Sequence, residues 1–315
     1  MQRLRDPLPW VAIILLALPP VAHALDAGFY VSFATRVMIF GMAALSLNLV
    51  LGFGGMTSLG HAAFMGIGAY TVGLLMLHGI SNGYLHFAAA IAVGAAASVV
   101  IGAICLRTGG LSFIMLTLAS AQLLFFVGSG LKQYGGDDGF SFRGRSDFGA
   151  LVPLNTPEAL YLFVLAWLVL TAWIVRRVVQ SRFGIALRGI KSNEARARSI
   201  GVHAYRYRLA AFVLAGTLSS ISGALLANLS QFVSPAYMHW SRSAELLLMV
   251  LLGGMSSVVG PLVGAAAFLL LEEGLAHLTN HWQALMGLVL VVIVMYARNG
   301  LGDLGRLLRR VRGAV

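Results

Sequence analysis

The sequence predicts an all-α polytopic membrane protein, with a single transmembrane domain over residues 1–315. Hydrophobic residues make up 59% of the chain and charged residues only 10%, whereas a soluble domain carries roughly 25% charged residues. Ten apolar runs follow one another, most of them near the about 20 residues that a membrane-crossing helix needs. So few charges cannot cover a water-facing surface of this size, and about ten transmembrane helices are expected instead.

The expected spans are, in chain order, residues 8–25, 29–51, 61–78, 85–106, 111–130, 158–179, 208–228, 240–256, 258–275 and 282–298. The first run follows a basic start and ends in the tripeptide Ala-His-Ala, which is typical of a secretory cleavage site. Because the rest of the chain is itself membrane-spanning, we interpret this run as an uncleaved first span, with cleavage as the alternative.

The basic residues predict the topology, since cytoplasmic loops of membrane proteins are enriched in Lys and Arg. Residues 176–208 hold nine basic side chains with Glu194 as the only acid, and the tail after residue 297 adds five more. Ten spans with both termini in the cytoplasm place 17 basic and 3 acidic residues inside, against 5 basic and 8 acidic residues outside. The net charge of +11 therefore reflects topology, and no basic patch interleaved with aromatic residues indicates nucleic-acid binding.

The segment "LNLVLGFGGMTSLGHAAFMGIGAYT" (47–71) places six glycines and no formal charge between two apolar runs. We expect "GFGG" (52–55) to end one helix and Thr57 or Ser58 to cap the next. Two interpretations remain open: a tight turn with a small-residue packing face, or a broken helix that lines a transport route. His61 is correspondingly a packed histidine or a pathway residue. A Walker-type phosphate loop is excluded, because no Gly-Lys-Ser/Thr follows.

The longest cytoplasmic loop is expected at 180–206. Asn193 is a plausible N-cap for a helix over 194–200, Gly201 is its stop, and a second short helix fits 183–191. Burying nine cations in lipid would cost more than about 20 kcal/mol, so the loop lies in water or against a protein. A solvated basic loop is one interpretation, and a partner-binding loop is the other. The apolar side chains that would face a partner are Ile185, Leu187, Ile190 and Ile200.

The longest outer loop is expected at 131–157, where Asp137 and Asp138 follow two glycines. No His or Cys lies near these carboxylates, which disfavours catalysis or a metal site and leaves a turn or a protein contact. No catalytic residue, metal or cofactor is expected elsewhere either, because the sequence has no clustered His, Asp and Glu.

Charged residues are scarce within the expected spans. The acids near their outer ends are Glu245, Glu272 and Glu273, and Arg36 lies about two turns inside the second span. Arg36 either extends outwards or pairs with an acid such as Glu245. Proton-coupled carriers place ionisable side chains in the membrane interior, so their scarcity argues against a self-sufficient secondary carrier.

Four segments together resemble one family. Segment 47–71, "GGDDGF" (135–140), "FGIALRGIKSNEARARSIGV" (183–202) and "LLGGMSSVVGPLVGAAAF" (251–268) follow the order seen in LivM-type permeases. These are membrane subunits of ATP-binding-cassette (ABC) importers for branched-chain amino acids. The last segment has Ser256 where Gly is usual. The third is also similar to the broader "EAA…G" importer loop, with Arg196 in place of the second Ala and a Gly spacing one residue longer.

The resemblance implies a function and partners. The chain would be a transport subunit rather than an enzyme, forming half of a translocation path in the bacterial inner membrane. Its partners would be a LivH-type permease, two ABC ATPase subunits and a periplasmic solute-binding protein. The implied ATPase-coupling residues are Gly184, Leu187, Ile190, Glu194, Ala195, Ile200 and Gly201. The implied contacts with the binding protein are Asp137 and Asp138.

Polar but uncharged positions suit a zwitterionic amino acid, because dipoles and hydroxyls match its termini and apolar walls match its side chain. The candidate path residues are Asn48, Thr57, Ser58, His61, Tyr70, Thr117, Ser120 and Gln122. The alternatives are a secondary carrier, or a permease of the same family for urea, short amides or aromatic acids.

Cysteine labelling tests the topology. In a variant without the single native Cys105, cysteines placed within 140–150 should react with a membrane-impermeant reagent from outside. Cysteines within 190–200 should react only from the cytoplasm, because the basic loops stay inside. Outside accessibility of a cysteine at residue 310 would contradict the ten-span topology.

Overall fold

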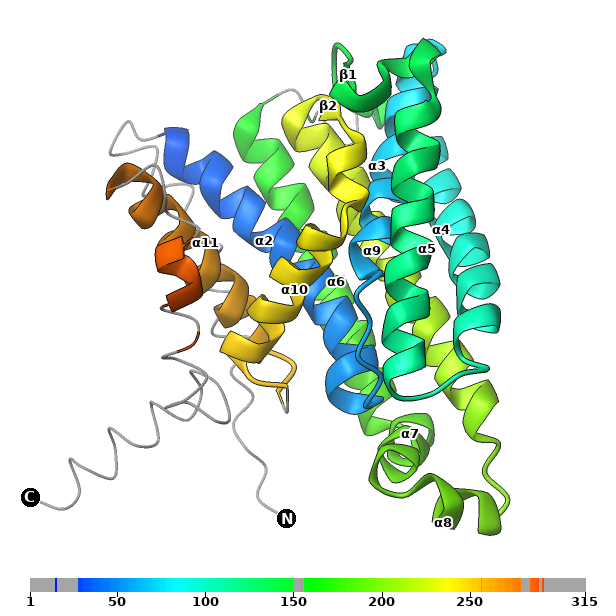
Figure 1. Cartoon of the computed structure of the whole chain (residues 1–315). Helices are drawn as coiled ribbons and strands as arrows, with labels where there is room; N and C mark the ends of the chain where they lie inside the picture. The colour runs from blue at the N-terminus through cyan, green and yellow to red at the C-terminus, as the bar shows by residue number, and fades with distance from the viewer. Residues whose placement is uncertain are drawn as a thin grey trace, which may run out of the picture.

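The computed structural model describes residues 28–149, 156–255, 257–278 and 284–288, together with the single residues 15, 154 and 291. The described part is mostly helical, as the composition predicts (Figure 1). Most of the expected spans 8–25 and 282–298, and all of the basic tail after residue 297, lie outside the described residues.

The α-helices are, in chain order, α2 (Gly28–Asn48), α3 (His61–Leu77), α4 (Gly83–Cys105), α5 (Leu111–Gly130), α6 (Pro157–Gln180), α7 (Arg182–Ser192), α8 (Glu194–Ser199), α9 (Ala204–Ser230), α10 (Trp240–Gly253) and α11 (Gly260–Leu278). A π-helix, η1 (Leu49–Phe53), continues α2. Short 3₁₀ helices are η2 (Lys132–Tyr134), η3 (Gly136–Asp138) and η5 (Pro235–Met238). Two short strands, β1 (Phe140–Ser141) and β2 (Phe232–Val233), pair antiparallel.

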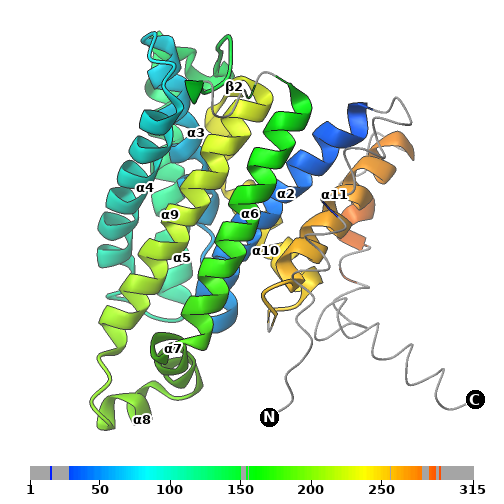
Figure 2. The same cartoon turned by 180° about the vertical axis from the view of Figure 1, so that it is seen from behind.

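Five helices of the described part are long and apolar enough to cross a membrane, namely Phe29–Phe53, Gly83–Cys105, Leu111–Gly130, Pro157–Gln180 and Ala204–Ser230. The chain is therefore a multi-pass membrane protein, but the expected number of ten spans is not confirmed. The run 240–256 forms α10, whose 14 residues span about 21 Å against a hydrocarbon core of about 30 Å. Helix α10 packs beside α11, and the two run in opposite directions (Figures 1 and 2).

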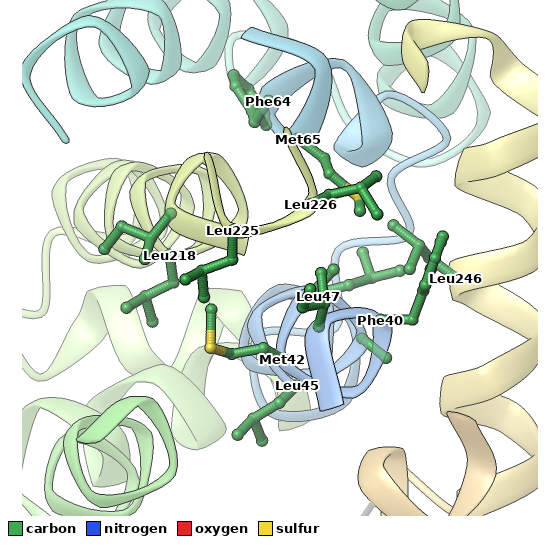
Figure 3. Packing of buried hydrophobic residues seen from close by; sticks show 14 of the residues in the cluster. Phe40, Met42, Leu45, Leu47, Phe64, Met65, Leu218, Leu225, Leu226 and Leu246 are labelled. Carbon is green, nitrogen blue, oxygen red and sulfur yellow. The ribbon is translucent and has the colours of Figure 1, made fainter. Parts of the chain in front are cut away.

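Helix α2 lies at the centre of the bundle, and it contacts α6, α9, α10 and α11. Its apolar window is 89% buried inside the chain, although a helix of this composition could face lipid all round. Figure 3 shows side chains leaving α2 on several sides, with Met42 turned towards Leu225 of α9. Helix α2 is thus surrounded by protein and supports the other helices.

Small residues let the helix backbones approach each other. A Cβ on Gly68 of α3 would lie 1.8 Å from the Ser220 carbonyl oxygen of α9, and one on Gly223 would lie 1.7 Å from the Met65 carbonyl oxygen. Helix α4 packs on the same α9, where the Ser220 hydroxyl donates to the Ala90 carbonyl at 2.8 Å. In lipid, where apolar burial gives little drive, such close packing and interhelical hydrogen bonds hold helices together.

The two long loops lie at opposite ends of the bundle (Figures 1 and 2). The β1–β2 pair ties one end, and α7 and α8 lie at the other. Which end faces the cytoplasm stays a prediction. Within the bundle, Arg36 pairs with Glu272 at 3.5 Å, while Glu245 pairs with Arg242 at 2.7 Å. Arg36 therefore has an acidic partner, but one from α11 rather than the Glu245 suggested by the sequence.

The contact between α3 and α9 predicts a stability effect. Gly68→Ala should lower the melting temperature of the purified protein in detergent, because overpacking against a backbone carbonyl costs about 1–3 kcal/mol or more. The matched control is Gly274→Ala in α11, where a Cβ would meet nothing within 4 Å. The control should leave the melting temperature unchanged or raise it, since Ala favours helix over Gly by about 0.5–1 kcal/mol. Equal melting temperatures of both variants would contradict this packing argument.

Candidate translocation and coupling site

The glycine turn, defined here as residues 52–60, ends α2 as the sequence predicts. The helix first widens into the π-helix η1, in which the Gly54 amide donates to the Leu49 carbonyl at 3.1 Å. It then stops at Gly55, whose φ of +68° lies in the left-handed region that glycine enters at little cost. The sequence did not indicate the π-helix, because Leu-Val-Leu-Gly-Phe has no feature that distinguishes a π-helix from the last turn of an α-helix.

The predicted cap of α3 is wrong. Helix α3 begins at His61 with Gly60 as its N-cap and without a side-chain cap, and the Ser58 hydroxyl accepts from the Gly60 amide at 3.3 Å. The Ala62 amide in the first turn instead donates to the Ser243 hydroxyl of α10, at 3.0 Å. A partner from another helix thus replaces the local cap, and no nearby residue in the sequence could have revealed it.

Tertiary contacts fix the rest of the glycine turn. A Cβ on Gly60 would lie 2.3 Å from the Thr117 carbonyl oxygen of α5, so only glycine fits without a shift. The Leu59 amide donates to the Thr117 hydroxyl at 3.3 Å. The turn is therefore held against α5, and its close packing agrees with the first of the two interpretations, a tight turn.

Asn48 connects the same turn to the α10–α11 connection. Its side-chain amide nitrogen donates to the Ser257 carbonyl at 2.9 Å. Its Oδ1 atom is buried and has no hydrogen-bond partner among the described residues. A Cβ on Gly52 would lie 2.1 Å from that oxygen, so Gly52 leaves the space that the amide occupies.

His61 is fully buried at the first position of α3. Its Nε2 atom lies 2.9 Å from the Ser46 hydroxyl, which gives its single proton to the Ala43 carbonyl at 2.7 Å. The imidazole Nε2 is then the donor in this bond. The Nδ1 atom is buried without a partner among the described residues, and the ring stands edge-on to Phe64. His61 is thus packed within the chain and keeps one free acceptor.

The other path candidates lie on α3 and α5. The buried hydroxyl of Tyr70 and the Oε1 atom of Gln122 have no hydrogen-bond partner in the described part of the chain. Tyr70 follows His61 by nine residues, about 13 Å along the helix. Ser120 donates to the Leu116 carbonyl at 2.8 Å, and Thr57 is half-buried. Asn48, Ser58, His61 and Thr117 thus lie around the glycine turn, and Tyr70 and Gln122 lie farther along the bundle.

The α7–α8 segment (residues 182–199) has the two helices that the sequence predicts. Asn193 caps α8 by accepting from the Arg196 amide at 2.9 Å, and Gly201 ends that region with φ +85°. Ser181 caps α7 in the same way, accepting from the Gly184 amide at 3.4 Å. Glu194 of α8 pairs with Arg208 of α9 at 2.8 Å, which holds α8 against the start of that helix.

Only part of the expected apolar side of this segment is exposed. Ile185 is 61% exposed and Ile200 is 76% exposed, but Leu187 and Ile190 are buried within the chain. The expectation that all four face a partner is therefore wrong, because Leu187 packs into the bundle core and Ile190 packs in a small cluster with Ala197 of α8 and Ala204 of α9. Gly184 is buried, whereas Ala195 and Gly201 are exposed.

A cleft of about 390 Å³ opens where α8 leads into α9. Its lining residues are Arg198, Gly201, Val202, His203, Ala204, Tyr205 and Arg206. The basic side chains on its rim suit an acidic or polar partner surface.

The outer-loop motif forms the expected turn. Gly135 and Gly139 have φ values of +84° and +75°, and a Cβ on Gly139 would lie 2.2 Å from the Val233 carbonyl oxygen. Asp137 and Asp138 are exposed on η3, so both carboxylates are open to solvent or to a partner.

Comparisons with known proteins agree on the class of protein. A family model described as a branched-chain amino acid transport system permease component matches residues 29–295. The high-affinity branched-chain amino acid transport system permease protein LivM of Salmonella typhimurium strain LT2 is 27% identical over 294 residues, which cover 86% of this chain and 69% of the relative. LivM of Escherichia coli K12 has the same identity and coverage.

Sugar-related permeases are similar as well. The ribose import permease protein RbsC of Escherichia coli K12 is 26% identical over 69% of this chain and 70% of its own length. No solved structure matches. The matched range contains the glycine turn, the outer-loop turn and the α7–α8 segment, and this chain therefore belongs to the family of branched-chain amino acid transport system permease components.

Proposed function

We propose that the chain is the LivM-type permease subunit of an ABC importer in the bacterial inner membrane, forming half of the path for a branched-chain amino acid. The observation that carries the proposal is the breadth of the similarity to LivM, which covers 86% of this chain, against 69% for RbsC. The proposed partners are a LivH-type permease, two ATPase subunits and a periplasmic solute-binding protein, with both termini of this chain in the cytoplasm.

Neutral polar groups support an uncharged or zwitterionic cargo. The orphan atoms at Asn48, His61, Tyr70 and Gln122 belong to groups without formal charge. Such groups match the polar ends of an amino acid, while the apolar side chains around them match its hydrocarbon part. We propose the eight path candidates named from the sequence as the contribution of this chain to that path.

A ribose-like sugar is the second candidate cargo, because RbsC is among the relatives. Urea, short amides and aromatic acids remain alternatives within the same class of permease, and a secondary carrier remains the alternative outside it.

Transport assays distinguish all of these candidate functions. The chain is co-expressed with its cognate LivH-type permease, ATPases and binding protein and reconstituted in proteoliposomes with ATP inside. Uptake of labelled leucine that needs both ATP and the binding protein is the expected result. Uptake of ribose or urea instead would overturn the proposed cargo. Uptake without ATP would overturn the proposal that the complex is an ATP-driven importer.

Coupling to ATP hydrolysis is proposed to occur through the α7–α8 segment. Ile185, Ile200 and the basic cleft beside α8 give an ATPase an exposed apolar and cationic surface. Glu194 and Gly201 fix how α8 leads into α9. Leu187, which is buried in the bundle core, would act by holding α7 to the bundle, and Ile190 would act by holding α7 to α8 and the start of α9.

Gly201→Val tests this coupling. A branched residue opposes the left-handed conformation by about 1–2 kcal/mol, so the variant should misdirect the chain after α8 and weaken ATPase docking. Gly144→Val is the matched control, because Gly144 also has a positive φ, +92°, and a Cβ there meets nothing within 4 Å, as at Gly201. We expect binding-protein-stimulated ATP hydrolysis to fall with Gly201→Val and to change little with Gly144→Val. Equal hydrolysis by the two variants would contradict the coupling role.

A further inference from the structure

Lys191 near the end of α7 reaches into the bundle. Its ammonium group donates to the Gly52 carbonyl oxygen at 2.6 Å, across 139 residues of sequence. Gly52 lies inside the π-helix η1 and is buried, whereas Lys191 as a whole is exposed. The contact therefore joins the α7–α8 segment directly to the glycine turn.

The position of this hydrogen bond follows from how α2 ends. The amides of Gly54, Met56 and Gly55 donate to the carbonyls of residues 49, 50 and 51, respectively. The next carbonyl along the chain is that of Gly52, and the Lys191 ammonium is its donor. Carbonyls at a helix C-terminus carry partial negative charge, so a cation is well placed there.

The stem of Lys191 is held as well as its charge. A Cβ on Gly55 would lie 2.7 Å from the Lys191 Cγ atom and 3.2 Å from its Cδ atom. Glycine at position 55 thus serves two needs, because its φ of +68° turns the chain and its missing side chain admits the lysine stem.

Residues at both ends of the glycine turn are hydrogen-bonded to three other parts of the bundle. Beside Gly52, Asn48 is bonded to the Ser257 carbonyl of the α10–α11 connection. At the other end of the turn, the Leu59 amide is bonded to Thr117 of α5, and the Ala62 amide to Ser243 of α10. A shift of α7 would therefore displace the turn, and through the turn it would act on α5, α10 and the α10–α11 connection.

We propose that Lys191 is the positioning residue that transmits movement of the α7–α8 segment to the glycine turn, and so to the helices of the translocation path. This inference rests on the proposed function as a permease driven by an ATPase. Arg188 and Arg198 of the segment make local bonds instead. Arg188 donates to the carbonyls of Val179 and Gly184, within α6 and α7, and is the matched control.

The first test measures coupling rather than folding. Lys191→Met keeps an unbranched side chain of similar length but removes the ammonium, Lys191→Arg keeps a cation, and Arg188→Met removes only local bonds. The readout is the ratio of solute taken up to ATP hydrolysed by the assembled complex. Lys191→Met should lower that ratio by between about twofold and about thirtyfold, the range for residues that couple distant sites. Lys191→Arg should restore much of it, and Arg188→Met should leave it near wild type.

A second arm restores the charge chemically after assembly. The complex carries Lys191→Cys in a Cys105→Ala background, since Cys105 is the only native cysteine of this chain. With 2-bromoethylamine, the thiolate sulfur displaces bromide and gains an aminoethyl group that ends in an ammonium. With iodoacetamide, the sulfur displaces iodide and gains a neutral amide. The aminoethylated complex should recover the uptake ratio, and the amide-bearing complex should not.

The outcomes separate the two proposals. If the wild-type complex takes up no offered solute in an ATP-dependent way, the proposed function fails before Lys191 is tested. If the wild-type complex transports and Lys191→Met has the same uptake ratio, the role of Lys191 is overturned. If the Lys191→Met complex fails to assemble, the labelling of Lys191→Cys tests the proposal instead. Equal uptake ratios after 2-bromoethylamine and after iodoacetamide would then overturn the role of Lys191.

Discussion

The close approach of α3 and α9 is the constraint on which the described structure depends. The glycines at positions 68 and 223 each face a backbone carbonyl of the other helix, so the two backbones touch with no side chain between them. Helix α4 then packs on the same α9, with Ser220 bonded to Ala90, and α2 packs against α9 from another side. In lipid, contact distance replaces hydrophobic burial as the source of specificity. The start of α3, and with it the glycine turn, is positioned by these contacts.

That position explains why the turn has so many glycines. Three of its four glycines each leave room for a contact with a different neighbour: Gly52 for Asn48, Gly55 for Lys191 and Gly60 for the Thr117 carbonyl. The turn is thus the point where α2, α5, α7 and the α10–α11 connection meet. A flexible loop would have no such neighbours. The glycines here give close packing rather than mobility.

Local signals in the sequence predicted much of this structure. Apolar runs gave the five long helices, Asn193 and Gly201 gave the bounds of α8, and paired glycines gave the outer turn. The errors concern contacts between distant segments. Ser243 replaces the expected cap of α3, and Leu187 and Ile190 are buried within the chain instead of facing a partner. The bond from Lys191 to Gly52 has no sequence signal either, because nothing local distinguishes this lysine from its basic neighbours. The proposed path would be shared with a second subunit, so a single sequence predicts only the polarity of its residues.

The π-helix at Leu49–Phe53 has a consequence for how the gene can change. A π-turn holds one residue more than an α-turn, so it has the length that a helix acquires when one codon is inserted. Loss of a codon in this stretch would let α2 continue as a regular helix, with its central packing intact. The carbonyl that meets Lys191 would then belong to a different residue, and Gly55 would no longer lie under the lysine stem. Relatives whose genes have one codon fewer in this stretch would therefore keep the bundle but change the contact between α7 and the turn.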